Sequence, residues 1–81
     1  MAILTHIPVF GEHSSDVALV QTALKESGFD TLGIDGIYGK NTKAAIIKFQ
    51  EANGLTKDGI LGKITLSSFN FIIIIPTNAY G

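Results

Sequence analysis

The chain has 81 residues, a formal net charge of −1 and no cysteine. A chain of this length can bury one compact core, and without cysteine it can form neither disulfides nor thiolate metal sites. The lysines are scattered and form no basic face, so the sequence argues against nucleic-acid binding and against electrostatic attachment to a membrane.

The first ten residues are predicted to form an extended arm or an edge strand. Several of them are apolar and β-branched, and Pro8 removes one backbone hydrogen-bond donor. The segment has no positively charged start and too short an apolar run for a signal peptide. No window of the chain reaches the roughly 20 apolar residues of a membrane span. The sequence therefore predicts no export signal of its own.

A first helix is predicted over residues 15–27. Ser14 or Ser15 can cap its start, and Asp16 places a negative charge in the first turn, where it complements the helix dipole. The apolar residues that follow recur at helical spacing, so one face is expected to be buried. Gly28 is a natural helix terminator.

An eight-residue motif occurs twice. Residues 35–42 are Asp-Gly-Ile-Tyr-Gly-Lys-Asn-Thr, and residues 58–65, displaced by 23 positions, are Asp-Gly-Ile-Leu-Gly-Lys-Ile-Thr. Each aspartate can accept a hydrogen bond from the backbone amide two residues on, and the glycine after it accepts a positive φ without a Cβ clash. The repeat predicts that one unit, a tight turn followed by a helix, is used twice.

The two motifs are predicted to begin the second and third helices. Asn41 or Thr42 should cap the second helix, which ends at Asn53-Gly54, and Thr65 should cap the third, which begins near Lys63. Three short helices joined by pinned turns make an all-α domain. The predicted core residues are Leu24, Ile37, Phe49, Leu55, Ile60 and Phe69, with Phe29, Leu32 and Ile34 expected to point into the same core.

The C-terminal run from Phe69 to Pro76 is too short and too β-branched for a further helix. We expect a strand with two apolar faces that pairs with the N-terminal arm, with another subunit or with the sheet of a partner. An isolated chain would then not be a well-behaved monomer. The alternative is that the run folds back and fills the chain's own core. The predicted partner-interface residues are Phe71, Ile72, Ile73, Ile74 and Ile75.

The spacing of these residues resembles a known family. The matching series is Val17-x-x-Val20-Gln21-x-x-Leu24, Gly28, the first motif, Ala45-Ile46-x-x-Phe49-Gln50, Asn53-Gly54-Leu55 and the second motif. It covers about residues 9–69 and is similar to the small three-helix peptidoglycan-binding domain attached to bacterial and phage cell-wall hydrolases. Three features depart from the family pattern: Lys40 and Lys63 replace the usual proline, Ser14 the usual glycine, and Leu66 the usual tryptophan.

The resemblance implies an all-α, three-helix bundle that acts as a non-catalytic wall-binding module. The domain is expected over residues 11–69, with a short extended N-terminal arm over 1–10 and an apolar C-terminal strand and tail over 70–81.

The residues themselves indicate no catalytic site, metal or cofactor. His6 and His13 are the only histidines, too few for a zinc site, and they lack an evident orienting carboxylate. The Asp-Gly turns lack the alternating carboxylates of a calcium loop, and no serine lies in a nucleophile motif. Glu26 and Glu51 are expected to be solvated charges rather than a glycosidase pair. We therefore predict that the chain is not an enzyme.

Candidate ligand residues gather around the first motif. The Tyr38 ring could lie flat against a sugar face or pack against the core. Asn41 and Thr42 could bind a muramyl peptide or only cap the helix, and the nearby lysines could meet a stem-peptide carboxylate or only face water. Gln21 and Gln50 could line a groove between the first two helices or face water. The candidate ligand-binding residues are Asp35, Tyr38, Lys40, Asn41, Thr42, Lys43 and Gln50.

Two functions stay open at this point. The first is non-catalytic binding of bacterial peptidoglycan, through its glycan strand or stem peptide, as a phage lysin or as a tail or baseplate module of a virion. The second is a structural role in the assembly of a phage particle, with the same fold used for protein contacts. Without an export signal, the chain is expected to reach the wall on lysis or in a particle, and otherwise to be cytoplasmic.

Overall fold

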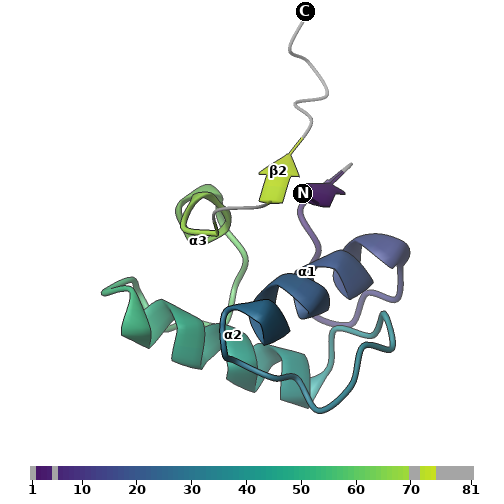
Figure 1. The fold of residues 1–81 in the computed structure, drawn as a ribbon, viewed down its shortest axis with the longest axis horizontal. Coiled ribbons are helices and arrows are strands. Elements are labelled where there is room, and N and C mark those ends of the chain that lie inside the picture. Colours follow the sequence, from purple (N-terminus) through teal and green to yellow (C-terminus); the bar gives the residue numbers. More distant parts are fainter. Residues whose placement is uncertain (1, 5, 70–71, 75–81) are drawn as a thin grey trace, which may run out of the picture.

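The computed structural model describes residues 2–4, 6–69 and 72–74. Its helices are α1 (Ser15–Glu26), α2 (Lys40–Ala52) and α3 (Lys63–Ser67), and its strands are β1 (Ala2–Leu4) and β2 (Ile72–Ile74). Helices α1 and α2 cross, and α3 and the strand pair lie on the same side of them (Figure 1). The three helices confirm the predicted all-α architecture. No helix among the described residues is both long enough and apolar enough to cross a membrane.

Helix α1 starts and stops at the signals in the sequence. The Ser14 hydroxyl oxygen accepts a hydrogen bond from the Val17 amide (3.3 Å), and Asp16 lies in the first turn. Glu26 is the last helical residue, and Gly28 follows with a φ of +95°, the left-handed conformation that ends many helices. The predicted first helix is confirmed, with its end one residue earlier.

Helices α2 and α3 begin without a side-chain cap, so the predicted caps are wrong. Gly39 and Gly62 occupy the N-cap positions, and neither helix start has a side-chain capping hydrogen bond. Each glycine has extended backbone directly before its helix and therefore takes the cap position itself. The residues predicted as caps all lie inside the helices: Asn41, Thr42 and Thr65.

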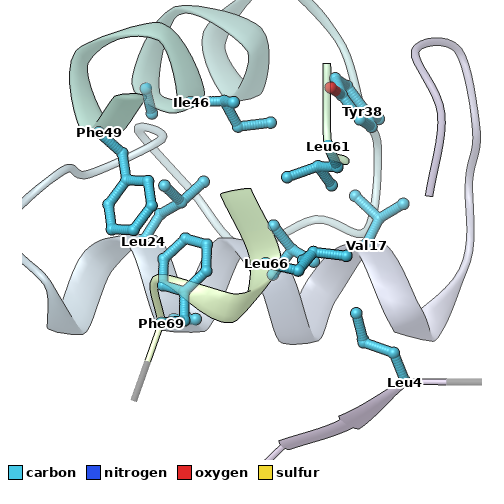
Figure 2. Close-up of a cluster of buried hydrophobic side chains, with 12 residues drawn as sticks. Leu4, Val17, Leu24, Tyr38, Ile46, Phe49, Leu61, Leu66 and Phe69 are labelled. Carbon is cyan, nitrogen blue, oxygen red and sulfur yellow. The ribbon is translucent and has the colours of Figure 1, made fainter. Parts of the chain in front are cut away.

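The core lies where the helices meet. The Phe49 ring stacks on the Phe69 ring (Figure 2), with centroids 3.9 Å apart and planes 6° from parallel. Phe29 meets Phe49 edge-on at 5.8 Å. Leu24, Phe49 and Phe69 are buried as predicted, and Leu55 is partly buried. Among the described residues, the other large buried apolar side chains are Leu4, Pro8, Val17, Val20, Tyr38, Ile46, Leu61 and Leu66.

Two residues predicted for the core are at the surface. Ile37 and Ile60 are 46% and 63% exposed, whereas the residues that follow them, Tyr38 and Leu61, are buried. The chain leaves the first turn in extended form, because Ile37 makes an antiparallel bridge with His13. Successive side chains of extended backbone point to opposite sides. The prediction for both isoleucines was therefore wrong: in each motif the buried side chain is the residue after the isoleucine.

The connection between α1 and α2 also exposes side chains expected in the core. Leu32 is 79% exposed with a φ of +65°, and Ile34 is exposed as well. Local polar bonds shape this loop: the Asp30 carboxylate accepts from the Leu32 amide (2.9 Å), and the Thr31 hydroxyl donates to the carbonyl oxygen two residues on (2.6 Å). These bonds turn Leu32 outward, so only Phe29 of the three residues packs against the core.

The C-terminal strand pairs with the N-terminal arm, the first of the three partners considered for it. Strands β1 and β2 run parallel, with Ala2 opposite Ile72 and Leu4 opposite Ile74. Leu4 is fully buried and points toward the helices (Figure 2). The rest of the predicted interface lies outside what the structure describes: Phe71 and Ile75 entirely, and the side chains of Ile72, Ile73 and Ile74.

Candidate functional site

Gln21, a buried residue of α1, organises the first Asp-Gly turn. Its Nε2 lies within hydrogen-bond distance of Asp35 Oδ1 (2.9 Å), the Ile37 carbonyl oxygen (3.0 Å) and Thr42 Oγ1 (2.9 Å). Its Oε1 accepts from the Gly36 amide (2.9 Å). One side chain therefore joins α1, the turn and the start of α2, and satisfies a buried backbone donor.

Gln50, on α2, makes the same contacts with the second turn. Its Nε2 lies 3.0 Å from Asp58 Oδ1, 3.0 Å from the Ile60 carbonyl oxygen and 3.1 Å from Thr65 Oγ1. Its Oε1 accepts from the Gly59 amide (2.9 Å). The glutamine precedes the aspartate by 14 residues in the first unit and by 8 in the second. The network is therefore produced by the folded unit and not by a fixed local spacing.

Each turn is also pinned by the local contacts that the sequence predicts. The aspartate Oδ1 accepts from the backbone amide two residues on, at 2.9 Å in both motifs. Gly36 and Gly59 have φ values of +76° and +70°. A Cβ atom would lie 3.0 Å from the Ser14 carbonyl oxygen at Gly36 and 2.7 Å from Lys43 Cγ at Gly59. Glycine is therefore required at both positions.

Hydrogen bonds lower the pKa of both turn aspartates below the ordinary value. The hydrogen bond from Gln21 is the main cause that lowers the pKa of Asp35 below its ordinary value of 3.8. For Asp58 the Ile60 amide is the main cause of the lowered pKa, followed by Gln50. Donors to a carboxylate favour its charged form, so each turn carries a negative charge at the surface.

An open groove of about 350 Å³ lies over the first turn. Asp35, Lys40 and Asn41 line it as exposed side chains, and Gln21 and Thr42 line it as buried ones. Two exposed apolar residues, Leu32 and Ile37, also line it, and Thr31 and Gly39 complete its walls. Four of the predicted ligand residues thus meet in one groove.

A second open groove, of about 700 Å³, lies over the second turn. Its lining includes buried Gln50 and Thr65 and the exposed side chains of Ile60, Lys63 and Ile64. Gln50 therefore belongs to a different groove from the other predicted ligand residues, and the predicted set does not form a single site.

Tyr38 is a core residue and not an exposed binding ring. It is 1% exposed and lies among the core side chains in Figure 2, and its hydroxyl donates to the Gly59 carbonyl oxygen at 2.5 Å. Burial raises the pKa of Tyr38 to about 12, and the negative charge of Asp58 adds to the effect. Its ring cannot lie against a sugar, so its choice as a ligand residue is wrong, and the alternative, packing against the core, is correct.

The exposed aromatic ring in this region is Phe10, which the sequence did not single out. It meets Tyr38 edge-on, with centroids 5.9 Å apart and planes at 75°. Lys43 Nζ lies 5.3 Å from the centroid of the Phe10 ring, a cation–π arrangement. Lys43 thus faces Phe10 and lines neither groove. The sequence did hold a signal for Phe10, because it is an apolar residue at the end of the arm, next to Gly11.

His6 lies between two carboxylates, contrary to the expectation that no carboxylate orients it. Its Nε2 is 2.5 Å from Glu12 Oε2 and its Nδ1 is 3.0 Å from Asp16 Oδ2. Burial alone would raise the pKa of Glu12, but hydrogen bonds from Ser14, His6 and Val9 together lower it. The cluster ties the N-terminal arm to the start of α1. In the described part of the chain, no group of three or more His, Cys, Asp or Glu residues is arranged to hold a metal ion.

Comparison with known proteins gives relatives for this fold. The N-acetylmuramoyl-L-alanine amidase CwlM of Mycobacterium tuberculosis is 40% identical over 65 residues, which cover 80% of this chain and 15% of the amidase. The type VI secretion system spike protein VgrG3 of Vibrio cholerae is 41% identical over 69 residues, covering 69% of this chain and 7% of that protein. The chain thus spans a small part of these longer proteins.

A solved structure and a family model agree with these matches. The crystal structure of the SleB N-terminal domain has a TM-score of 0.77 and 35% identity, and the alignment covers 84% of this chain and 93% of that one. Residues 13–68 match the family model described as "Putative peptidoglycan binding domain". The chain belongs to this peptidoglycan-binding domain family.

Proposed function

We propose that the chain is a non-catalytic module that binds bacterial peptidoglycan, and that the groove over the first turn is its binding site. The observation that supports this site is that four of the seven predicted ligand residues line this one groove: Asp35, Lys40, Asn41 and Thr42. Membership in the family supports peptidoglycan as the class of ligand.

The chemistry of the groove suits a stem peptide with a carboxylate. The Lys40 ammonium lies at the start of α2, a helix without a side-chain cap, and both features favour an anionic group. The Asn41 amide can donate to and accept from a peptide or an N-acetyl group. Leu32 and Ile37 offer exposed apolar surface to methyl groups.

Sedimentation with purified sacculi tests the proposal, and the chain offers two matched pairs of variants. Lys40→Ala is expected to lower the fraction of protein in the pellet severalfold, whereas Lys48→Ala, an equal change on the exposed side of α2, should leave it unchanged. Ile37→Ser should also lower it, whereas Ile34→Ser should not. These isoleucines are almost equally exposed, at 46% and 45%, and only Ile37 lines the groove.

Two outcomes would contradict the proposal. A folded wild-type protein that stays in the supernatant is not a wall-binding module under those conditions. Equal retention of wild type, Lys40→Ala and Ile37→Ser would move the binding site away from the first groove. Circular dichroism of each variant checks that its helices are intact.

The wall-binding module of the first proposal would be carried in a phage lysin or in a virion. A second candidate function is a structural role in the assembly of a phage particle, with the same fold used for protein contacts. The similarity to VgrG3, which is named as a spike protein, supports it. Here the C-terminal strand would pair with a second copy or a partner's sheet. Replacing Ile72 and Ile74 with Thr keeps strand propensity and should weaken association without unfolding the helices. Light scattering that finds the wild-type protein monomeric at high concentration would contradict this candidate.

A further inference from the structure

We infer that the groove over the second turn is a second peptidoglycan-binding site, so that one chain binds two units of the polymer. The inference rests on the function proposed for the first groove. The eight residues that line the first groove outside α1, moved by 23 positions, all line the second groove. Six of the eight are the same amino acid: Leu55, Asp58, Ile60, Gly62, Lys63 and Thr65 in the second groove.

The two grooves agree in their atomic support as well as in their lining. The Gln50 side chain holds the second turn through the same four contacts that Gln21 makes with the first, and each distance differs from its counterpart by no more than 0.2 Å. Asp58 is ionised as Asp35 is, and Lys63 is exposed as Lys40 is. A ligand group that fits the first groove therefore meets the same charges in the second.

The second groove is larger and more apolar than the first, and two of the eight matched positions differ. Ile64 replaces Asn41 and is 70% exposed, and Gly54 replaces Thr31. With Ile60, this gives two exposed isoleucines beside the Lys63 ammonium, in about 700 Å³ against about 350 Å³. Exposed apolar side chains that cluster in a groove indicate a binding surface. The ligand part that suits this groove is a stem peptide, whose methyl groups cover the isoleucines and whose carboxylate meets the lysine.

A repeating polymer is the ligand that uses two such grooves together. The two units are joined directly, because the Tyr38 hydroxyl donates to the Gly59 carbonyl oxygen. Lys43 Cγ of α2 lies 2.7 Å from the place that a Cβ atom would take at Gly59. Two similar sites on one small domain can hold two stem peptides of the same material, and the second contact then forms at a high effective concentration. The affinity for intact wall should therefore exceed the affinity for a single repeat unit.

The test compares soluble muropeptides with intact sacculi. In a titration followed by NMR, muropeptide should change the backbone amide chemical shifts of residues 39–42 and also of residues 62–65. Two equivalents of muropeptide should bind per chain. Ile60→Ser should abolish the second set of shifts and keep the first, and should lower retention on sacculi by about tenfold or more as the linked contact is lost. Ile34→Ser, exposed and outside both grooves, should change neither readout.

The possible results separate this inference from the function on which it rests. Shifts at residues 39–42 alone, with one equivalent bound and normal retention of Ile60→Ser, would overturn the second site and leave the first standing. Shifts at residues 62–65 alone would overturn the two-site inference and the proposed first groove. If muropeptide causes no chemical-shift changes and the wild-type protein is not retained on sacculi, the wall-binding function itself is overturned.

Discussion

The hydroxyl of Tyr38, in the first Asp-Gly unit, donates a hydrogen bond to the carbonyl oxygen of Gly59, in the second. Tyr38 is buried and so is Gly59, so this contact joins the two repeats inside the molecule. A buried carbonyl that loses its donor keeps the cost of its desolvation. The contact therefore connects the stability of the fold with the relative placement of the two grooves.

Tyr38→Phe should destabilise the fold by about 1–3 kcal/mol, because the ring stays and only the donor is lost. For a domain of this size, each kcal/mol lowers Tm by about 4–8 °C. Thermal unfolding followed by circular dichroism measures the change. A Tm equal to that of the wild type would show that the hydroxyl contributes nothing.

The same hydroxyl predicts a loss of stability at alkaline pH. Its pKa is raised in the folded state from 10 to about 12, so the stabilising effect is complete below pH 10 and is lost as the pH rises from 10 to about 12. Urea unfolding across this range should show the decline. Tyr38→Phe serves as the control, since its stability should fall less over the same range.

Gln50→Glu should destabilise the fold by about 3 kcal/mol or more at neutral pH, because a carboxylate replaces the donor beside Asp58 and the Ile60 carbonyl oxygen. Urea unfolding measures the loss, and acidification that protonates the new glutamate should restore part of it. Asn41→Asp is the control: the same chemical change at an exposed position in the first turn of α2 should be neutral or slightly stabilising. Equal effects of the two variants would rule out a special role for the Gln50 network.

The ionised aspartates predict a loss of stability in acid. The pKa values of Asp35 and Asp58 are lowered in the folded state from 3.8, so their contribution is present above pH 3.8 and is lost as the pH falls below that value. The urea midpoint should therefore drop across this range. Asp58→Asn should show a smaller drop, and an unchanged pH dependence in that variant would contradict the assignment.

Phe49→Ala should cost about 3–5 kcal/mol, since it removes a ring that contacts both Phe69 and Phe29. Chemical denaturation measures the free energy of unfolding. Ile64→Ala, at an exposed position, is expected to change it by no more than about 0.5 kcal/mol. A stability unaffected by Phe49→Ala would refute this part of the core.

Local chemistry was predictable from the sequence by itself. The aspartate-to-amide bonds, the positive φ of Gly36 and Gly59, the Ser14 cap and the stop at Gly28 each depend on atoms within a few residues of one another. The repeated motif likewise indicated one unit used twice, and the spacing of the apolar residues indicated three helices and the family.

Only the tertiary structure decided which side of each turn faces the core. Ile37 and Tyr38 are both apolar enough to be buried, and the choice between them follows from what packs across the chain. The glutamines bridge 14 and 8 residues, and β1 pairs with a strand about 70 positions away. Such contacts form between segments that the chain brings together only on folding, so no local pattern specifies them. For the same reason the repeat predicted two turns but not the two grooves, whose walls come from different helices and loops.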